Sequence, residues 1–321
     1  MSFIRDSRIS QSLKQVLDTV EDVQEHYLAA EDEEFDSFQE NLTLKIENQE
    51  VSKPKDDRKS AVISISGDNP GTRAVIFEVI KAEKVSEGRS SFVRYTLSVS
   101  TEGEPEKTPG IIEKRYSDFS DLNTKLKKCF HKDMELISFP GKLVMGNFTD
   151  ETIAQRSRAF EQFLTHIFTI DSLRFSDELK NFLYQERMQE GLESIHRGNF
   201  SHCVAVMEKY LPVQERVMGD QHSDVVCTLC VLSVCHQKLG DREAALEYAE
   251  SALSCINDDQ TSPFLVPLLD HTIYLCWVLC REKSHLEARL GGLRDKGAKS
   301  EELLTVILNY TKFDSVWYED K

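Results

Sequence analysis

The sequence has 321 residues, of which 40% are hydrophobic and 29% charged, a composition typical of a globular chain with about two domains. Its formal net charge of −16 argues against general nucleic-acid binding, which needs a basic face to displace counterions. Residues 71–187 are neutral overall, whereas the segments on both sides are acidic. Attraction to an anionic surface is therefore expected to be local and to lie in this middle segment.

Neither a membrane span nor a secretory signal is expected. The longest apolar runs are far too short to cross a bilayer, and the first residues lack an apolar signal segment. We therefore expect a cytosolic protein whose eight cysteines are thiols.

Residues 1–70 are predicted to form a largely disordered acidic region, because residues 29–60 are rich in Glu, Asp, Ser, Gln and Lys. Before that stretch, apolar residues follow helical a/d spacing and predict a helix over residues 9–28. So short a helix is marginal alone, and two interpretations stay open: it packs on its own protein, or it binds a partner. The apolar positions are Ile9, Leu13, Val16, Val20, Val23 and Tyr27.

Residues 71–186 show an α+β pattern, with strands followed by helices. Strands are predicted over residues 74–85, 92–100 and 111–116, and their short connections indicate an antiparallel meander. Helices follow. Ser117 is the predicted N-cap of the first, either Thr149 or Asp150 caps a longer one, and a short one covers residues 177–183.

Residues 187–321 are predicted to be all helical and to contain a repeat. The turn at 197–200 (Arg-Gly-Asn-Phe) recurs at 239–242 (Leu-Gly-Asp-Arg), each between apolar-periodic segments. Small residues at Ala245, Ala249 and Ala252 would let two helices approach closely. The pattern is that of tetratricopeptide-like hairpins, with a period longer than the usual ~34 residues. A third unit is expected over residues 267–293.

One segment carries the main functional signal: residues 114–119 (Lys-Arg-Tyr-Ser-Asp-Phe), which end the third strand and open a helix. A strand-anchored Arg115 can offer a bidentate fork to a phosphate. Tyr116 can present a flat ring to a sugar-like inositol, and the helix start adds free N–H groups. Phosphate recognition is therefore the predicted chemistry.

This segment resembles the phox-homology (PX) domain, whose third strand is followed by Arg-Arg/Lys-Tyr-x-x-Phe. Two further motifs occur in the same order: the loop 139–142 (Phe-Pro-Gly-Lys) and the helix 156–164 (Arg-Ser-Arg-Ala-Phe-Glu-Gln-Phe-Leu). The resemblance covers residues 72–186 and implies a domain that binds phosphoinositides.

The resemblance also implies a role for each matched residue. Arg115 would bind the 3-phosphate of phosphatidylinositol 3-phosphate, and Tyr116 would stack on the inositol ring. Lys142 would pair with the 1-phosphate, and Arg156 would hydrogen-bond the 4- and 5-hydroxyls. The sequence departs from the family pattern at two positions, Gly141 and Ser157, and these departures would weaken the binding or relax the preference for one phosphoinositide.

Each of these charged residues also has a simpler interpretation. Arg115 would form a surface salt bridge, Lys142 would be a solvated loop lysine, and Arg156 would pair with Glu151 or Glu161.

A secondary membrane contact is predicted next to the headgroup site. Leu143, Val144 and Met145 form an apolar tip after Lys142, and Ser117 lies beside the phosphate position. Some of these apolar side chains would instead pack inward, and Phe148 is expected to do so.

A PX domain followed by a helical region resembles the group of sorting nexins that carry a PX-associated B domain. The resemblance implies a non-enzymatic, peripheral adaptor at early endosomes that binds phosphatidylinositol 3-phosphate and, through its helical domain, an unidentified protein. No nucleic acid, metal or cofactor is expected. The alternative is a protein scaffold whose lipid specificity is broadened, for example to phosphatidylinositol 4,5-bisphosphate, or lost.

The cysteine spacing Cys227-x-x-Cys230 suggests a zinc or redox site. No second ligand pair follows at a suitable distance, and both residues lie in an apolar helix. We therefore interpret them, together with Cys276 and Cys280, as core residues. Motifs for kinases, lipases and metallopeptidases are absent from the sequence, in line with a non-enzymatic protein.

Overall fold

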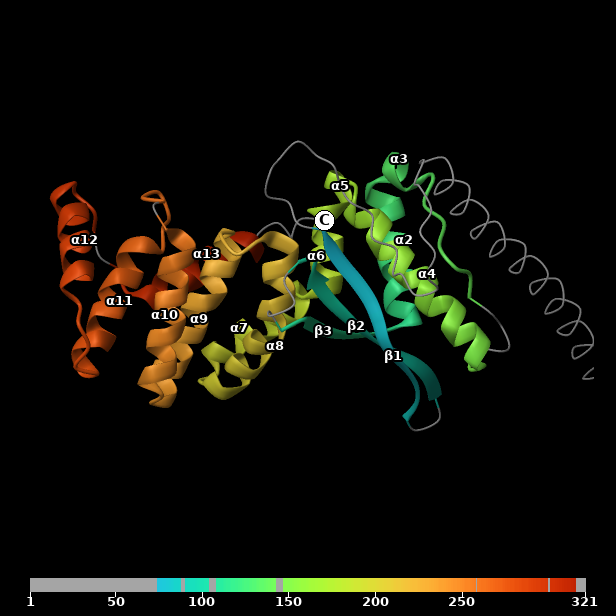
Figure 1. Cartoon of the computed structure of the whole chain (residues 1–321), viewed down its shortest axis with the longest axis horizontal. Helices are drawn as coiled ribbons and strands as arrows, with labels where there is room; N and C mark the ends of the chain where they lie inside the picture. The colour runs from blue at the N-terminus through green and yellow to red at the C-terminus, as the bar shows by residue number, and fades with distance from the viewer. Residues whose placement is uncertain are drawn as a thin grey trace, which may run out of the picture. The chain divides into compact units, whose positions relative to one another are not determined.

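A computed structural model describes residues 74–87, 90–103, 108–142, 147–257, 259–299 and 301–315 (Figure 1). The helix predicted over residues 9–28 and the rest of residues 1–70 lie outside the described residues, as do Leu143, Val144 and Met145. The described residues group into two compact units. One comprises Met1–Leu97 and Glu113–Leu179, and the other Ser98–Ile112 and Lys180–Lys321.

The strands form a three-stranded antiparallel sheet in the order β1-β2-β3 (Figure 1). They are β1 (Val75–Glu87), β2 (Ser90–Thr101) and β3 (Gly110–Arg115). The alternating β2 residues Val93, Tyr95, Leu97 and Val99 are buried, as expected for a strand with one face on a core. The predicted antiparallel meander and the α+β pattern are confirmed.

Helices follow the strands along the chain, and α4 packs against β1. An aromatic core joins them: the Phe119 and Phe160 rings stack with centroids 3.8 Å apart, and Tyr95 meets Phe160 edge-on at 5.0 Å. This core lies directly behind the start of α2. The helices are α2 (Tyr116–Cys129), α3 (His131–Met134), α4 (Asp150–Phe168), α5 (Asp171–Arg174) and α6 (Asp177–Leu183).

The predicted N-cap of α2 is wrong. The helix begins at Tyr116 with Arg115 as its N-cap, not with Ser117. Asp118, at the third helical position, accepts the backbone N–H of Arg115 at 2.9 Å, as an acidic residue does in a capping box. The helix therefore starts without the Ser117 hydroxyl. By contrast, Thr149 caps α4 as predicted, because its hydroxyl accepts the Thr152 N–H at 3.2 Å.

The second unit contains helical hairpins in which each helix packs on the next, while α13 packs on α9 and α11. The predicted recurring turn is present. Gly198 and Gly240 have positive φ angles of 71° and 89°, and Asn199 and Asp241 then cap the following helices. The helices are α7 (Gln185–His196), α8 (Phe200–Met218), α9 (Ser223–Leu239), α10 (Arg242–Ile256), α11 (Leu265–Val278), α12 (Ser284–Asp295) and α13 (Leu303–Ser315).

The predicted close packing within the second hairpin is also present. Ala245, Ala249 and Ala252 are fully buried on α10, which packs against α9. The structure likewise buries Cys227 and Cys230, so their interpretation as core residues is confirmed.

The same interpretation holds for one of the two remaining cysteines and fails for the other. Cys276 is buried, but Cys280 is exposed. Helix α11 ends at Val278, so Cys280 lies beyond it in a left-handed turn (φ 52°) and away from the packed face.

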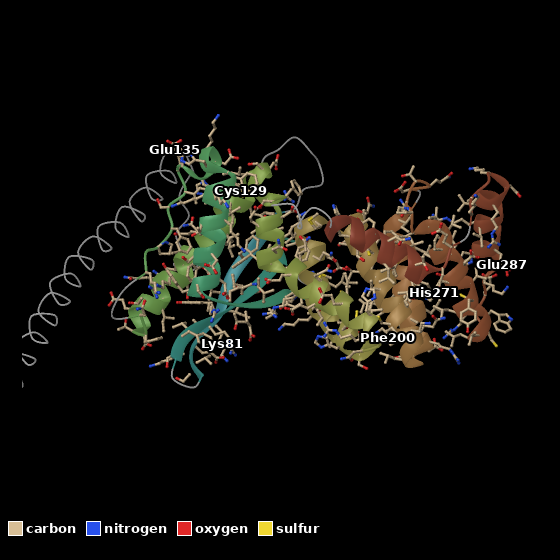
Figure 2. All side chains as sticks on the ribbon, turned by 180° about the vertical axis from the view of Figure 1, so that it is seen from behind. Lys81, Cys129, Glu135, Phe200, His271 and Glu287 are labelled. Carbon is tan, nitrogen blue, oxygen red and sulfur yellow. The ribbon has the colours of Figure 1, made fainter. Side chains whose placement is uncertain are left out.

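A buried hydrogen-bond chain ties three helices of the second unit together. Ser233 of α9 donates to the Ala245 carbonyl at 2.7 Å, so its single proton is used there. His271 of α11 (Figure 2) must therefore donate from Nε2 to the Ser233 Oγ at 2.9 Å. Burial lowers the pKa of His271 from 6.5 to about 4, because a charged imidazole would be poorly solvated there.

We expect the protein to lose stability as the pH falls from 6.5 towards 4. In that window the unfolded His271 binds a proton and the folded one does not, at a cost of about 3 kcal/mol when complete. His271→Gln keeps a donor near the Nε2 position but does not titrate, so denaturant unfolding should show a flatter pH dependence. The exposed His196 provides the control: His196→Gln should leave the slope unchanged, and an equal change in both variants would contradict the role of His271.

Candidate functional site

The four predicted headgroup residues come from three segments of the first unit. Arg115 ends β3, Tyr116 opens α2, Lys142 lies in the loop between α3 and α4, and Arg156 lies in the second turn of α4. The fold places them because β3 runs directly into α2, and because the loop from Pro140 returns to the start of that helix.

Arg115 is held by an exposed ion pair. Its Nε lies 3.2 Å from Asp118 Oδ1, with the two side chains 55% and 35% exposed. Its guanidinium carbon is also 5.9 Å from the Phe92 ring centroid. The simpler interpretation of Arg115 as a surface salt bridge is therefore present in the structure. Such pairs contribute only ~0–1 kcal/mol, so a phosphate can replace the carboxylate at small cost.

Tyr116 is fixed at both ends of its side chain. Its hydroxyl donates to the Pro140 carbonyl at 2.8 Å. Its ring lies against Phe139 and Phe160, with centroids 5.9 and 6.1 Å away. The ring is therefore held in place before any ligand arrives.

Arg156 is buried, with 4% of its surface exposed. Its guanidinium carbon lies 4.4 Å from the Tyr116 ring centroid, a cation–π distance, and its Nη2 donates to the Gly141 carbonyl at 3.5 Å. The predicted positions Tyr116 and Arg156 thus meet each other and both contact the 140–141 loop. No pattern in the sequence indicates that the Arg156 side chain is so deeply buried.

The alternative ion pair of Arg156 does not form within the described residues. Glu161 instead accepts the backbone N–H of Val79 at 2.7 Å, and burial raises its pKa. The Arg156 charge acts on Tyr95, where it opposes the rise in pKa that burial causes.

Lys142 follows Gly141 directly and is exposed, which suits a residue that meets a phosphate at the mouth of a site. Ser117 is exposed too, and its Oγ lies 3.5 Å from Asp118 Oδ1. The apolar tip at 143–145 lies outside the described residues. Phe148, expected to pack inward, is 42% exposed, and the Lys84 ammonium lies 4.5 Å from its ring centroid; that expectation is wrong.

Comparison with known proteins places this chain in a family. A family model for the PX domain matches residues 104–186. Sorting nexin-21 from Mus musculus is 37% identical over 227 residues, which are 70% of this chain and 62% of that protein. Sorting nexin-20 from Bos taurus is 30% identical over 216 residues, which are 67% and 68% of the two chains. The chain belongs to the sorting nexin family.

This sorting nexin is also 37% identical to human sorting nexin-21 over 224 residues, or 60% of that protein. It therefore spans about 60% of the length of its sorting nexin-21 relatives. The predicted resemblance to PX-containing sorting nexins is confirmed.

Sequence reasoning missed three groups at the site of this sorting nexin. Asp118 is the present partner of Arg115, and the carbonyls of Pro140 and Gly141 hold Tyr116 and Arg156. Asp118 was detectable, since an acidic residue three positions after an N-cap is a capping signal. The contacts of the two carbonyl groups were not detectable, because backbone groups are the same in every residue and leave no pattern in the sequence.

Other site types find no support in the part of the chain that the structure describes. No group of three or more His, Cys, Asp or Glu residues there could hold a metal ion. None of the helices there is both long enough and apolar enough to cross a membrane.

Proposed function

We propose that this sorting nexin binds the headgroup of phosphatidylinositol 3-phosphate at Arg115, Tyr116, Lys142 and Arg156. The observation that carries the proposal is the contact between Arg156 and the Tyr116 ring at 4.4 Å, with both residues anchored to the loop that precedes Lys142. Two positions far apart in sequence, Tyr116 and Arg156, thereby form one cationic and aromatic contact.

Each residue has a distinct part in the proposed complex. Arg115 exchanges Asp118 for the 3-phosphate and gains a bidentate, charge-assisted pair. Tyr116 offers its ring to the inositol, Lys142 meets the 1-phosphate, and Arg156 donates its remaining N–H groups to the 4- and 5-hydroxyls.

A second membrane contact accompanies the headgroup in this proposal. Ser117 would lie beside the phosphate, and Leu143, Val144 and Met145 would enter the bilayer surface. Burying two or three such side chains is worth on the order of a few kcal/mol, which suits reversible rather than permanent attachment.

The wider role we propose is that of a non-enzymatic, peripheral adaptor in endosomal sorting. Residues 71–186 would bind the cytosolic face of early endosomes as a PX domain. Residues 187–321 would bind a protein as a tetratricopeptide-like PX-associated B domain, while residues 1–70 form the acidic region. Two weak contacts used together would lengthen the residence time at the membrane.

Two observations favour a second candidate, a protein scaffold with broadened or lost lipid specificity. Asp118 already forms an ion pair with Arg115, and the residues Gly141 and Ser157 depart from the family pattern. In that case phosphatidylinositol 4,5-bisphosphate would bind with an affinity similar to that of phosphatidylinositol 3-phosphate, or neither lipid would bind.

A fluorescent fusion in cells tests the proposed role. We expect puncta that coincide with early endosomes and that disperse into the cytosol when 3-phosphoinositides are depleted. Puncta that survive depletion would contradict recruitment by this lipid and favour the scaffold.

A further inference from the structure

Helix α13 lies across the stacked hairpins of the second unit. It packs on α9 and α11, which are the first helices of two successive hairpins. Phe264, the residue that precedes α11, meets the Tyr310 ring of α13 edge-on with centroids 5.0 Å apart. Stacked helical repeats present one continuous face to their partners. Here a helix of the same chain covers part of such a face.

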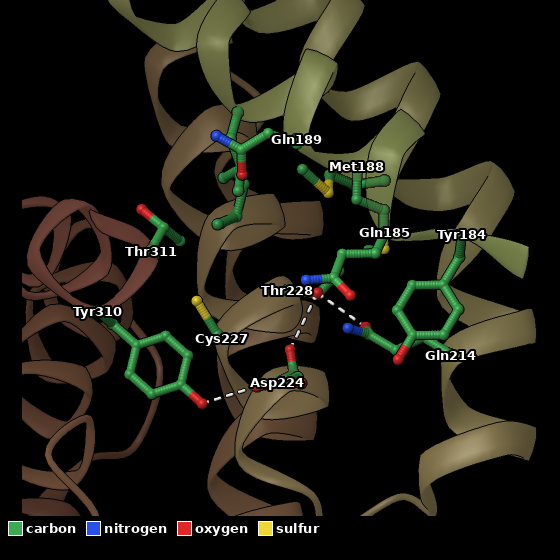
Figure 3. A pocket seen from close by; sticks show the side chains of 13 residues that line it. Tyr184, Gln185, Met188, Gln189, Gln214, Asp224, Cys227, Thr228, Tyr310 and Thr311 are labelled. Atoms are coloured by element: carbon green, nitrogen blue, oxygen red, sulfur yellow. Dashed lines mark hydrogen bonds between the residues drawn. The ribbon is translucent and has the colours of Figure 1, made fainter. Parts of the chain in front are cut away.

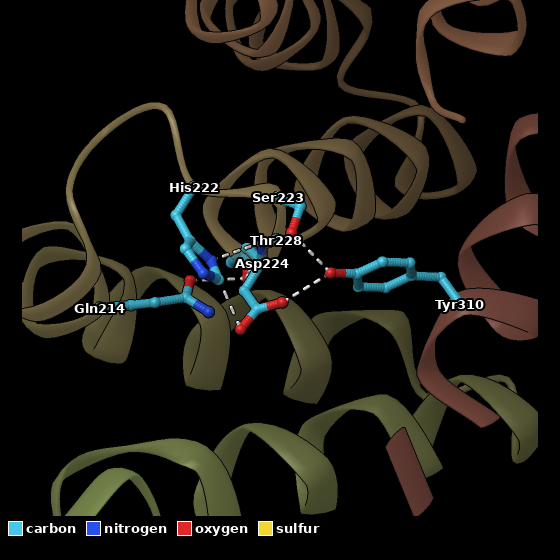
Figure 4. A network of polar contacts seen from close by, with 6 residues as sticks. All are labelled: Gln214, His222, Ser223, Asp224, Thr228 and Tyr310. Atoms are coloured by element: carbon cyan, nitrogen blue, oxygen red, sulfur yellow. Dashed lines mark hydrogen bonds and ion pairs between the residues drawn. The ribbon is translucent and has the colours of Figure 1, made fainter. Parts of the chain in front are cut away.

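The contacts that hold α13 on this face are few. Of its side chains that the structure describes, Leu303 and Ile307 are the buried ones, one helical turn apart. The next turn is held by polar contacts (Figure 4). The Tyr310 hydroxyl donates to Asp224 Oδ1 at 2.7 Å and lies 2.8 Å from Ser223 Oγ. Water replaces such partly exposed hydrogen bonds at small net cost, so the attachment of α13 is modest.

The fit of α13 is also incomplete. A cavity of about 80 Å³ separates Tyr310 and Thr311 from Gln185 and Met188 (Figure 3), and Met207 adds to its apolar wall. This volume is well below the ~300–1,000 Å³ of small-molecule pockets, so it suits one side chain. Because atoms that line a void lose their packing partners, a helix that filled the cavity would pack better than α13 does.

We propose that the face of α7, α9 and α11 that α13 now covers is a protein-binding surface, and that its partner is an amphipathic helix that displaces α13. The partner would carry aliphatic residues at positions i and i+4 and a hydrogen-bonding aromatic residue at i+7, as α13 does at Leu303, Ile307 and Tyr310. One further side chain would fill the cavity. This inference rests on the proposed role of residues 187–321 in binding a protein.

The connection to α13 allows such a displacement. Helix α12 ends at Asp295 and α13 begins at Leu303, and an extended connection reaches about 3.3–3.6 Å per residue. Helix α13 can therefore leave the face while the stacked hairpins stay together. While it is attached, its effective concentration at the face is high, so only a helix that binds more tightly would replace it.

A labelled peptide of residues 301–315 tests the proposal with the full chain, because it carries the required pattern and competes with the attached α13. Ile307→Asp in the chain puts a charge on the buried face of α13. By fluorescence anisotropy, the peptide should bind this variant about tenfold more tightly than the wild type, since the attached helix no longer competes. Asn309→Asp adds the same charge at an exposed position of α13 and should behave like the wild type.

A milder variant keeps the test valid if Ile307→Asp unfolds the helical unit. Tyr310→Phe removes the hydrogen bond to Asp224 and preserves the ring. The peptide retains this hydroxyl, so it should bind the Tyr310→Phe chain severalfold more tightly than the wild type. A peptide that itself carries Tyr310→Phe should lose this advantage.

Three results would overturn the proposal. The first is equal binding of the peptide to all these chains, and the second is no binding to any of them. The third is a dimer in light scattering that exchanges α13, because a second copy would then be the occupant. Localisation of the same variants in cells reports separately on the proposed function: endosomal puncta that persist while the peptide fails to bind would overturn this surface alone.

Discussion

The full chain with Arg115→Ala is expected to lose binding to phosphatidylinositol 3-phosphate liposomes by about 10- to 100-fold. A charge-assisted hydrogen bond is worth ~1.5–3 kcal/mol, and arginine provides two in a fork. Folding should be little affected, because the ion pair with Asp118 is exposed. Liposome flotation measures the loss.

Two further variants separate the contribution of the planar guanidinium group to lipid binding from the contribution of its positive charge. Arg115→Lys keeps the charge without the planar fork and should fall between the wild type and Arg115→Ala. Arg187→Ala removes the same charge from α7, where Arg187 pairs with Glu190 at 3.0 Å, and should float like the wild type. Unchanged flotation of Arg115→Ala would remove Arg115 from the site.

Gly110→Ala is expected to destabilise the protein by about 3 kcal/mol, in the range of severe overpacking. A Cβ at Gly110 would lie 2.6 Å from a methyl carbon of Val213 and 2.8 Å from its backbone nitrogen. Backbone atoms of a helix cannot move aside cheaply. The same segment is held by Arg216, whose guanidinium donates to the Thr108 and Pro212 carbonyls. Thermal or denaturant unfolding measures the change.

Gly292→Ala is the matched control. Gly292 lies in α12, and a Cβ there would meet nothing within 4 Å, so alanine should stabilise by ~0.5–1 kcal/mol through its better helix propensity. If both variants unfolded like the wild type, the tight contact between Gly110 and Val213 would be refuted.

Much of the first unit was predictable from local pattern. Three β-rich segments joined by short connections allow few arrangements other than a meander, and the 177–183 helix matches α6 (Asp177–Leu183). The start of α2 was not predictable, because several residues within 115–118 could act as the N-cap. The hydrogen bond between the Arg115 N–H and Asp118 decides which of them does. In the second unit, the Gly-Asn and Gly-Asp turns were readable because a positive φ favours glycine.

The site was predictable as a set of residues but not as a geometry. The family motif names Arg115, Tyr116, Lys142 and Arg156, yet it does not reveal that Arg156 is buried against Tyr116 or that Asp118 holds Arg115. Those features depend on where the 140–141 loop returns, which is a long-range contact. The exposure of Phe148 and Cys280 has a similar cause, since both lie just outside helices whose ends a pattern places only approximately.

The most direct test of the proposed function is a titration of the full chain against liposomes that each carry one phosphoinositide. A pocket built on Arg115, Tyr116, Lys142 and Arg156 predicts the tightest binding to phosphatidylinositol 3-phosphate, lost in Arg115→Ala. A flat response across the lipids, or no response to any of them, would contradict it.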